Sequence, residues 1–415
     1  MTQKQTYQEI LPHLFRQEYA KMTAVLCRLF GLHHIEIAED IASDTFLKAS
    51  EYWAINGIPE NPAAWLYTVA KNKAKDYCKH IGIAEKQLKE TIQPINFETE
   101  QETEYSHQYI ADSQLAMIFT VCNPAIAAEA QIALALQILC GFSIEEIANA
   151  LLSKPETIKK RLFRARTSLR NAHFEISSLS KSEIQLRQDT VLKTLYLLFN
   201  EGYFSKTYNQ LIRKDLCLEA LRLTLALTES PLTNTLQTNA LLALMCFQSS
   251  RLDARTNDKG ETVLFDQQDR TLWDQTLIDR GNIYLVNACH NNEVSKYHLE
   301  AGIAYWHTTT ENENKWQYIL QLYNQLIIIE YSPVTALNKI FALSRVHGKA
   351  FALPEALKLN LTDSNYYHEL LGYLYSDHNS GKAIEHYQQA IRLSKSEAEK
   401  QNIKKEIERL GHSGS

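Results

Sequence analysis

Apolar residues recur every three or four positions along most of the 415-residue chain, which is the spacing of one face of an α-helix. Near the N-terminus this pattern predicts helices at about 7–30, 35–53 and 62–80. The break between the first two helices is Gly31-Leu32-His33-His34, and the turn-rich stretch Asn56–Asn61 separates the second from the third. Asn61 is a suitable N-cap for the third helix, and Pro62 is a suitable first residue.

Two helix starts follow each other closely in the middle of the chain. An Ala- and Leu-rich helix at 127–140 is expected to end at Gly141. Ser143–Glu146 is a capping box that opens a short helix to about 151. Ser153–Glu156 is a second capping box, which opens a helix to about 174. Two helices joined by so short a turn predict a helix-turn-helix.

From about 183 to 410 the pattern predicts one helix after another. Turns are expected at Gly202, Ser230-Pro231, Asn257–Gly260, Gly281, Asn291-Asn292, Ser332-Pro333 and Gly348. The residues that follow a tetratricopeptide pattern are His368, Leu371, Gly372, Tyr375, Ala383, Tyr387 and Ala390. The first position is His where the pattern has Trp, and the spacing from Tyr375 to Ala383 is one residue short. The sequence therefore predicts an all-α chain, and the 13 Gly and 9 Pro, few for its length, agree with this.

The overall composition excludes several classes of protein. A chain of 415 residues is expected to form two to four domains, and 45% hydrophobic with 22% charged residues is ordinary for a soluble protein. It has neither a membrane-spanning run nor a secretory signal, so we expect a cytoplasmic protein with no membrane partner. The seven cysteines are scattered and form no C-x-x-C pair, which argues against disulfides and against a zinc site. We expect no metal and no cofactor.

The net charge of −5 hides an uneven distribution of charge. Seven basic residues lie between Lys154 and Arg170 beside a single acid, and six lysines lie between Lys71 and Lys89. The stretch between the two basic segments, Glu90–Asp112, carries six acids and no Lys or Arg. The sequence therefore has two basic segments joined by an acidic linker.

The basic segment near 160 has the pattern of a DNA-reading helix. On one helical face we place Ile158, Leu162, Ala165 and Leu169, and on the opposite side Lys159, Lys160, Arg161, Arg164 and Arg166. A basic face opposite an apolar stripe suits the major groove, where cations pair with phosphates and Arg can read guanine. The alternative is a solvated basic face without a partner.

The basic segment near 70 interleaves aromatic residues with lysines. From Asn61 to Tyr77, aromatic residues are interspersed with lysines and an Asn. Aromatic rings stack on unpaired bases while cations follow the phosphate backbone. The alternative is that Trp65, Val69 and Tyr77 are core residues.

Several segments together resemble the extracytoplasmic-function sigma factors. Ala38–Ala49 and Trp65–Asn72 resemble conserved region two, and the helix-turn-helix with Ile147-Ala148 and Arg161–Arg166 resembles region four. Farther along, the segments 198–203, 241–255 and 266–273 look like the extension of a subgroup with a tetratricopeptide-like C-terminal domain. The resemblance spans nearly the whole chain. One departure is the turn Leu151–Pro155, which lacks the usual Gly and leaves the register of the recognition-helix contacts open.

The resemblance implies a division into region two at 7–80, an acidic linker at 81–112, region four at 113–175 and a helical extension at 183–410. The implied partners are core RNA polymerase and promoter DNA, both duplex and single-stranded. The residues implied for the polymerase clamp, in the largest subunit, are Glu39, Asp40 and Asp44. Those implied for holding and melting the minus-ten element are Asn56, Asn61, Trp65, Tyr67, Lys71, Asn72 and Lys75. Those implied for the minus-thirty-five element are Thr157, Lys159, Lys160, Arg161, Arg164 and Arg166. The linker would occupy the nucleic-acid channel of the polymerase.

Other interpretations remain open. The chain has no Walker loop, no H-E-x-x-H and no G-x-S-x-G, so we expect no enzyme activity. Arg251, Arg255, Asp266, Asp269 and Arg270 could form a ligand site, but a salt-bridge network between helices is the expectation. The C-terminal domain is expected to regulate the chain itself or to recruit a regulatory protein. The rival functions are a polymerase-independent helix-turn-helix regulator with a sensing domain, and a helical-repeat scaffold.

Overall fold

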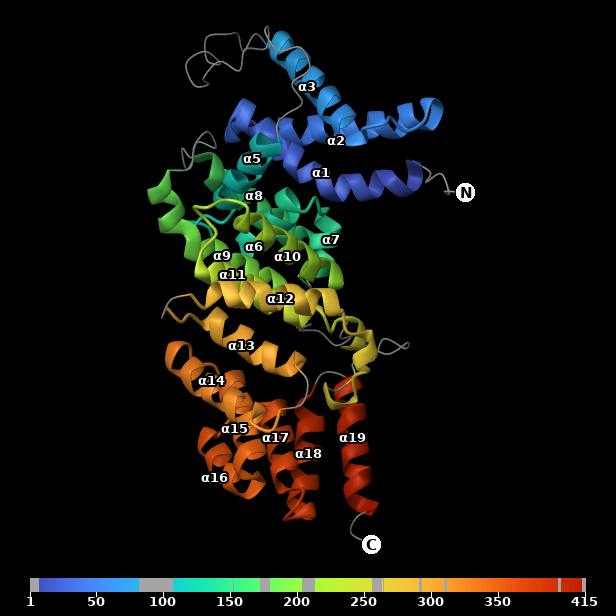
Figure 1. The fold of residues 1–415 in the computed structure, drawn as a ribbon. Coiled ribbons are helices and arrows are strands. Elements are labelled where there is room, and N and C mark those ends of the chain that lie inside the picture. The colour runs from blue at the N-terminus through green and yellow to red at the C-terminus, as the bar shows by residue number, and fades with distance from the viewer. Residues whose placement is uncertain are drawn as a thin grey trace. The chain divides into compact units, whose positions relative to one another are not determined.

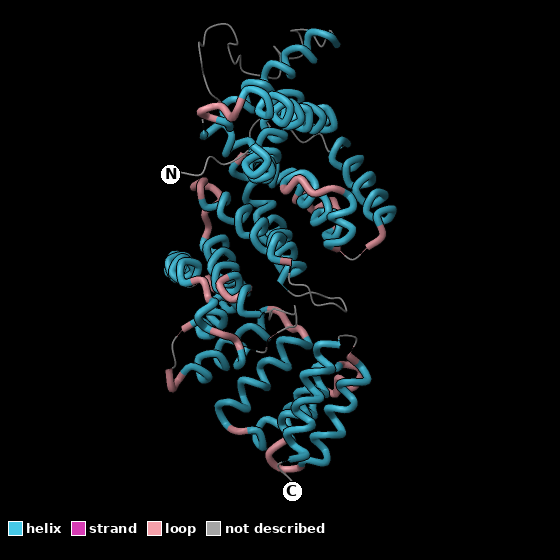
Figure 2. The backbone as a smooth tube through the Cα atoms, turned by 90° about the vertical axis from the view of Figure 1, so that its right-hand side faces the viewer, coloured by secondary structure: helices cyan, strands magenta, loops and turns pink. Residues whose placement is uncertain are grey.

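The chain is helical throughout the part that the computed structural model describes. The described residues are 7–81, 107–151, 153–171, 180–203, 213–255, 263, 265–290, 293–309, 312–394 and 397–412. Every regular element in these ranges is a helix, which confirms the all-α prediction (Figure 2). The chain forms two compact units, Met1–Leu197 and Leu198–Ser415, and helix α9 (Lys181–Tyr203) runs from one into the other.

The first three helices of the N-terminal unit lie close to where the apolar pattern predicts them. They are α1 (Tyr7–Phe30), α2 (Ile35–Asn56) and α3 (Pro62–Ile81), and α1 packs on both of the others (Figure 1). Gly31 and Gly57 end the first two helices with φ of +82° and +81°, a backbone region that glycine adopts at low cost. The core of this three-helix group contains Trp53 and Leu66.

Helix α5 (His107–Val121) begins inside the segment predicted as linker. Its first turns are held on α1, because the Arg28 guanidinium lies 4.5 Å from the centre of the Tyr109 ring and donates a hydrogen bond to the Ser113 hydroxyl (3.4 Å). The periodicity before residue 113 is too weak to predict these contacts. The predicted linker, 81–112, therefore overlaps α5 at its end, and most of it lies outside the described residues.

The rest of the unit contains α6 (Ala128–Leu134), a π-helical turn (Ala135–Leu139), α7 (Ile144–Ala150) and α8 (Pro155–Asn171). Gly141 ends the predicted 127–140 helix with φ of +71°. The capping box of α7 is present, since Ser143 and Glu146 each bond the other's backbone amide. The second box is not in the predicted position. Because the Lys154 carbonyl accepts from the Ile158 amide (3.2 Å), Lys154 and not Ser153 precedes the first turn of α8.

The first turns of α9 belong to the N-terminal unit, although the sequence places them in the extension. The Thr194 hydroxyl donates a buried hydrogen bond to the Gln131 side chain (2.6 Å), and Arg187 donates to the Phe119 carbonyl (3.4 Å). The boundary between the units therefore lies within a helix. No composition change marks this position, because a continuous helix needs none.

The C-terminal unit is a series of packed helices, each lying against the next one or two in sequence (Figure 1). They are α10 (Lys214–Thr228), α11 (Leu236–Ser249), α12 (Gln275–Ala288), α13 (Lys296–Thr308), α14 (Lys315–Ile329), α15 (Pro333–His347), α16 (Lys349–Leu359), α17 (Asn365–Tyr375), α18 (Ser380–Leu393) and α19 (Glu397–His412). The predicted turns at Ser332-Pro333 and Gly348 are present, with Ser332 as the N-cap of α15 and Gly348 at φ +89°.

The tetratricopeptide pattern corresponds to the packing of α17 on α18. A Cβ at Gly372 would lie 2.6 Å from the Tyr387 ring, so only glycine permits this approach of the two helices. Ala383 and Ala390 are fully buried beside it. The small residues therefore pack as the pattern predicts, in one helix pair.

Gly281 is not a turn, contrary to the sequence prediction. It lies inside α12, and a Cβ there would be 2.7 Å from the ring of Phe247 on α11. Glycine is present because α11 and α12 approach closely. Turn and close-packing glycines look alike in a sequence, so the pattern could not separate them.

Gly281→Ala is expected to lower the free energy of unfolding by about 1–2 kcal/mol, because Phe247 is fully buried and cannot move aside without strain. Chemical denaturation followed by circular dichroism measures the change. Gly381→Ala is the control, since its Cβ would meet only Asn379 Oδ1 at 3.5 Å. Equal stability of the two variants would contradict the packing role of Gly281.

The described helices include none that is both long and apolar enough to cross a membrane. The described residues include six free cysteines, of which five are buried and Cys289 is exposed. Burial raises the pKa of Cys122, Cys217 and Cys246 to about 12, so these thiols stay protonated near neutral pH and act as small core residues.

Candidate nucleic-acid and polymerase interface

Helix α8 is amphipathic in the way that the sequence predicts. Ile158, Leu162, Ala165 and Leu169 are all buried, and they face the rest of the unit, where α8 packs on α6 and α7. The apolar stripe therefore fixes which side of the helix is free to meet a partner.

The side of α8 opposite the apolar stripe carries exposed cations. Thr157, Lys159, Lys160 and Arg164 are exposed, and within the described ranges none of the three cations forms an ion pair. Phe163 lies among them with 66% of its surface exposed. Phe163 is not among the residues predicted to bind DNA, although its position opposite the apolar stripe indicates an exposed side chain. An exposed ring among free cations can contact the apolar edge of a base, such as a thymine methyl group.

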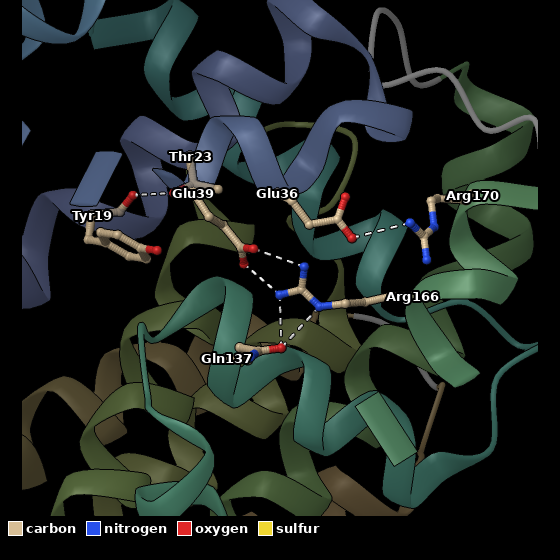
Figure 3. A network of polar contacts seen from close by, with 7 residues as sticks. All are labelled: Tyr19, Thr23, Glu36, Glu39, Gln137, Arg166 and Arg170. Atoms are coloured by element: carbon tan, nitrogen blue, oxygen red, sulfur yellow. Dashed lines mark hydrogen bonds and ion pairs between the residues drawn. The ribbon is translucent and has the colours of Figure 1, made fainter. Parts of the chain in front are cut away.

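A second set of cations on α8 is paired within the unit. Arg166 forms a two-pronged ion pair with Glu39 of α2: Nη1 donates to Oε2 at 2.9 Å, and Nη2 donates to Oε1 at 2.7 Å (Figure 3). Nη2 and Nε also donate to the side-chain oxygen of Gln137, at 2.9 and 3.2 Å. Planar pairing of this kind is among the strongest side-chain interactions in proteins.

The Arg166–Glu39 pair is largely removed from water, with side-chain exposures of 12% and 16%. Burial acts to lower the pKa of Arg166, but the hydrogen bonds and the charge of Glu39 outweigh it and raise that pKa. The guanidinium therefore stays charged, and each charge depends on the other to offset its desolvation.

One turn farther along α8, Arg170 lies 3.3 Å from Glu36 of α2, in a pair that is more exposed (Figure 3). We call the pairs Arg166–Glu39 and Arg170–Glu36 the clasp. The clasp joins α2 to α8 across 127 and 134 positions of sequence. Arg161 is paired elsewhere, with Glu129 at 2.6 Å. Of the cations predicted to bind duplex DNA, Lys159, Lys160 and Arg164 are therefore available, while Arg161 and Arg166 are engaged.

The acidic residues predicted to contact the polymerase divide in the same way. Asp40 and Asp44 are exposed on α2, and Asp44 forms an ion pair with Lys73 of α3 (3.1 Å). Glu39, in contrast, is held in the clasp. Access to Glu39 therefore requires the clasp to open.

The residues predicted to hold single-stranded DNA lie on and before α3. Asn61 caps this helix as predicted, since its side chain accepts from the Ala64 amide (3.1 Å). Trp65 is half-buried and stacks on Tyr52, with ring centres 5.5 Å apart. Tyr67 is buried and donates to Glu18 (3.1 Å), so in this structure it is a packing residue.

The other predicted residues are more accessible. Asn56 and Asn72 are exposed, and the Asn56 side chain donates to the Tyr52 carbonyl (3.1 Å). Lys71 and Lys75 are half-buried on α3. Helix α3 thus carries the stacked ring of Trp65 and, one to three turns farther along, Lys71 and Lys75. Rings and cations are the chemistry that unpaired bases require.

Residues 14–81, which form α2, α3 and most of α1, match the model of sigma-70 region 2. This match supports a protein of the sigma-70 family. A sigma-70 region 2 points to binding of RNA polymerase and promoter DNA and to a role in transcription initiation. Residues 187–289 match a family of unknown function, DUF6596.

The chain also resembles an uncharacterized protein of Rhizobium meliloti (strain 1021). The two are 30% identical over 407 residues, which is 94% of each chain, so they share both units. No solved structure matches the chain.

Proposed function

We propose that this chain is a sigma factor of the extracytoplasmic-function type, which binds core RNA polymerase and directs initiation at its own promoters. The observation that carries the proposal is a region 2 domain followed by α8, a helix with an apolar packed side and free cations on the other. A sigma factor needs both parts, one to engage the polymerase and open DNA and one to grip duplex DNA upstream.

In this proposal α7 and α8 form the helix-turn-helix of region four. Lys159, Lys160 and Arg164 contact the minus-thirty-five element, with Thr157 at the start of the helix. The exposed Asp40 and Asp44 face the polymerase clamp. The unpaired strand of the minus-ten element binds along α3 at Trp65, Lys71, Asn72 and Lys75. Asn56 ends α2 and Asn61 lies just before α3, one at each end of the connecting loop. The chemistry of RNA synthesis belongs to the polymerase.

The clasp adds a condition to this function. Glu39 and Arg166 occupy each other, so neither is available to polymerase or DNA while the clasp is closed. Binding to core polymerase would separate α2 from α8 and release both. The helical C-terminal unit is the proposed regulatory domain, which acts on the chain itself or recruits a protein.

Co-elution with core RNA polymerase tests the proposal. The purified chain is expected to form a complex with core enzyme, and the double variant D40K/D44K is expected to bind at least tenfold more weakly, because it reverses two exposed charges at the interface. Asp189→Lys, an exposed acid on α9, is the control and should bind as the native chain does. A native chain that does not bind core enzyme would overturn the proposal.

A further inference from the structure

Residues 251–273 of the C-terminal unit carry many polar side chains that the proposed function does not use. The sequence predicts a salt-bridge network here, but the structure shows cations on aromatic rings. The Arg255 guanidinium lies 3.9 Å from the centre of the Tyr203 ring and donates to the Tyr203 carbonyl (3.0 Å). Asp269 bonds the backbone and side chain of Thr271, as an N-cap. The side chain of Asp266 lies outside the described residues.

Four side chains from distant segments gather around the ring of Phe265. We call Arg251, Phe265, Trp273, His307 and Lys315 the Phe265 cluster. From the centre of the Phe265 ring, the Arg251 guanidinium carbon is 5.0 Å away, the Lys315 ammonium 5.9 Å, the His307 ring 5.0 Å and the Trp273 ring 6.2 Å. The cluster thus brings together side chains that follow α11, precede α12, and lie on α13 and α14.

The charge of the cluster is positive. Lys315 is only 8% exposed, and Arg270 adds a third cation 5.6 Å from the Trp273 ring. Neither Arg251 nor Arg270 forms an ion pair with a described side chain. Burial, and then the charges of Arg251 and Lys315, lower the pKa of His307 to about 3. The imidazole therefore stays neutral near pH 7.

Several polar atoms of the cluster are shielded from solvent and make no hydrogen bond. They are Nε of Arg251, Nε1 of Trp273 and Nδ1 of His307. A buried polar atom without a partner costs about 1–3 kcal/mol, so such atoms mark a place where something else binds. A water molecule can accept hydrogen bonds from N–H groups, but it carries no charge to offset neighbouring cations. An anion does both.

We propose that the Phe265 cluster binds a small oxyanion, the phosphate or carboxylate group of a small-molecule ligand. The Arg251 Nε–H and Trp273 Nε1–H groups donate to its oxygens, and Lys315 and Arg270 contribute positive charge. The rings of Phe265 and Trp273 form apolar walls. The site gives the C-terminal unit a ligand to sense, and it does not depend on the role of the N-terminal unit.

Nuclear magnetic resonance of the full-length ¹⁵N-labelled chain tests the site. The chain has five tryptophans, and the signal lost in Trp273→Phe identifies the Trp273 indole N–H. Inorganic phosphate and acetate are the probes for the two oxyanion groups, and chloride at equal ionic strength is the blank. We expect a saturable shift of the Trp273 signal with phosphate or acetate. A bound anion should also raise the pKa of His307, because a nearby negative charge favours the imidazolium form.

Arg251→Gln is expected to weaken the binding of the anion at least tenfold. Arg345→Gln is the matched control, because Arg345 lies over the ring of Trp316 (5.0 Å) in the same unit but outside the cluster. If Arg251→Gln does not fold, Trp273→Phe serves as the second variant. It keeps an aromatic ring at this position, removes the indole N–H donor, and should weaken phosphate binding measured by calorimetry. The absence of a saturable shift, a response to chloride equal to that with phosphate, or unchanged affinity in both cluster variants would overturn the proposal.

Discussion

Replacing Glu39 with Gln is expected to lower the stability of the N-terminal unit by about 2–4 kcal/mol, because it leaves the Arg166 guanidinium without its counter-charge in a largely buried position. Chemical denaturation measures this. Glu36→Gln is the matched control, since the Arg170–Glu36 pair has side-chain exposures of 34% and 50% and is expected to contribute about 0–1 kcal/mol. Equal losses in the two variants would contradict a dominant role for the Arg166–Glu39 pair.

The same substitution has a second expected effect, on binding. When the clasp is closed in most chains, the apparent affinity for DNA is the affinity of the open chain multiplied by the fraction of chains that are open. Opening the clasp therefore raises the apparent affinity. Glu39→Gln is therefore expected to strengthen the binding of free chain to its promoter duplex, measured by fluorescence anisotropy. A double-mutant cycle with Arg166→Gln separates the pair from its single residues. Unchanged DNA affinity in Glu39→Gln would show that the clasp does not limit access to α8.

The double variant K160E/R164E is expected to weaken binding to the promoter duplex at least a hundredfold. Each lost cation removes a contact of about 1–3 kcal/mol, and each new acid repels phosphate. Anisotropy with a labelled duplex measures the affinity at fixed salt. The control K181E/K193E makes the same change in net charge at exposed positions on α9 and should bind nearly as the native chain does. Equal weakening in both would assign the effect to net charge and not to α8.

Periodicity and capping residues predict a helix well where its bounds depend only on residues within that helix and next to its ends. The bounds of α2 and α3 are within about three residues of the prediction, and Asn61 and Ser143 cap their helices as expected. These features depend on the spacing of apolar residues and on side chains within one turn of the backbone they bond. Such information is local, so the sequence carries it.

The features that the sequence did not reveal depend on contacts between distant segments. Arg166 and Glu39 are 127 positions apart, and each has a plausible separate partner, so no pattern joins them. Glycine is present at position 281 because the ring of Phe247 packs against it, a contact that a sequence does not show. Among the described side chains, Arg251 contacts the Phe265 ring and the Tyr203 hydroxyl, which the packing of distant segments brings next to it.

The proposed function is that this chain directs initiation by core polymerase. Run-off transcription with purified chain, purified core RNA polymerase and a library of genomic fragments tests it most directly. The expected result is transcripts that start at defined positions, that require the chain, and that disappear with K160E/R164E but persist with K181E/K193E. Sequence-specific DNA binding with no transcript beyond that of core enzyme alone would contradict the claim and favour a polymerase-independent regulator.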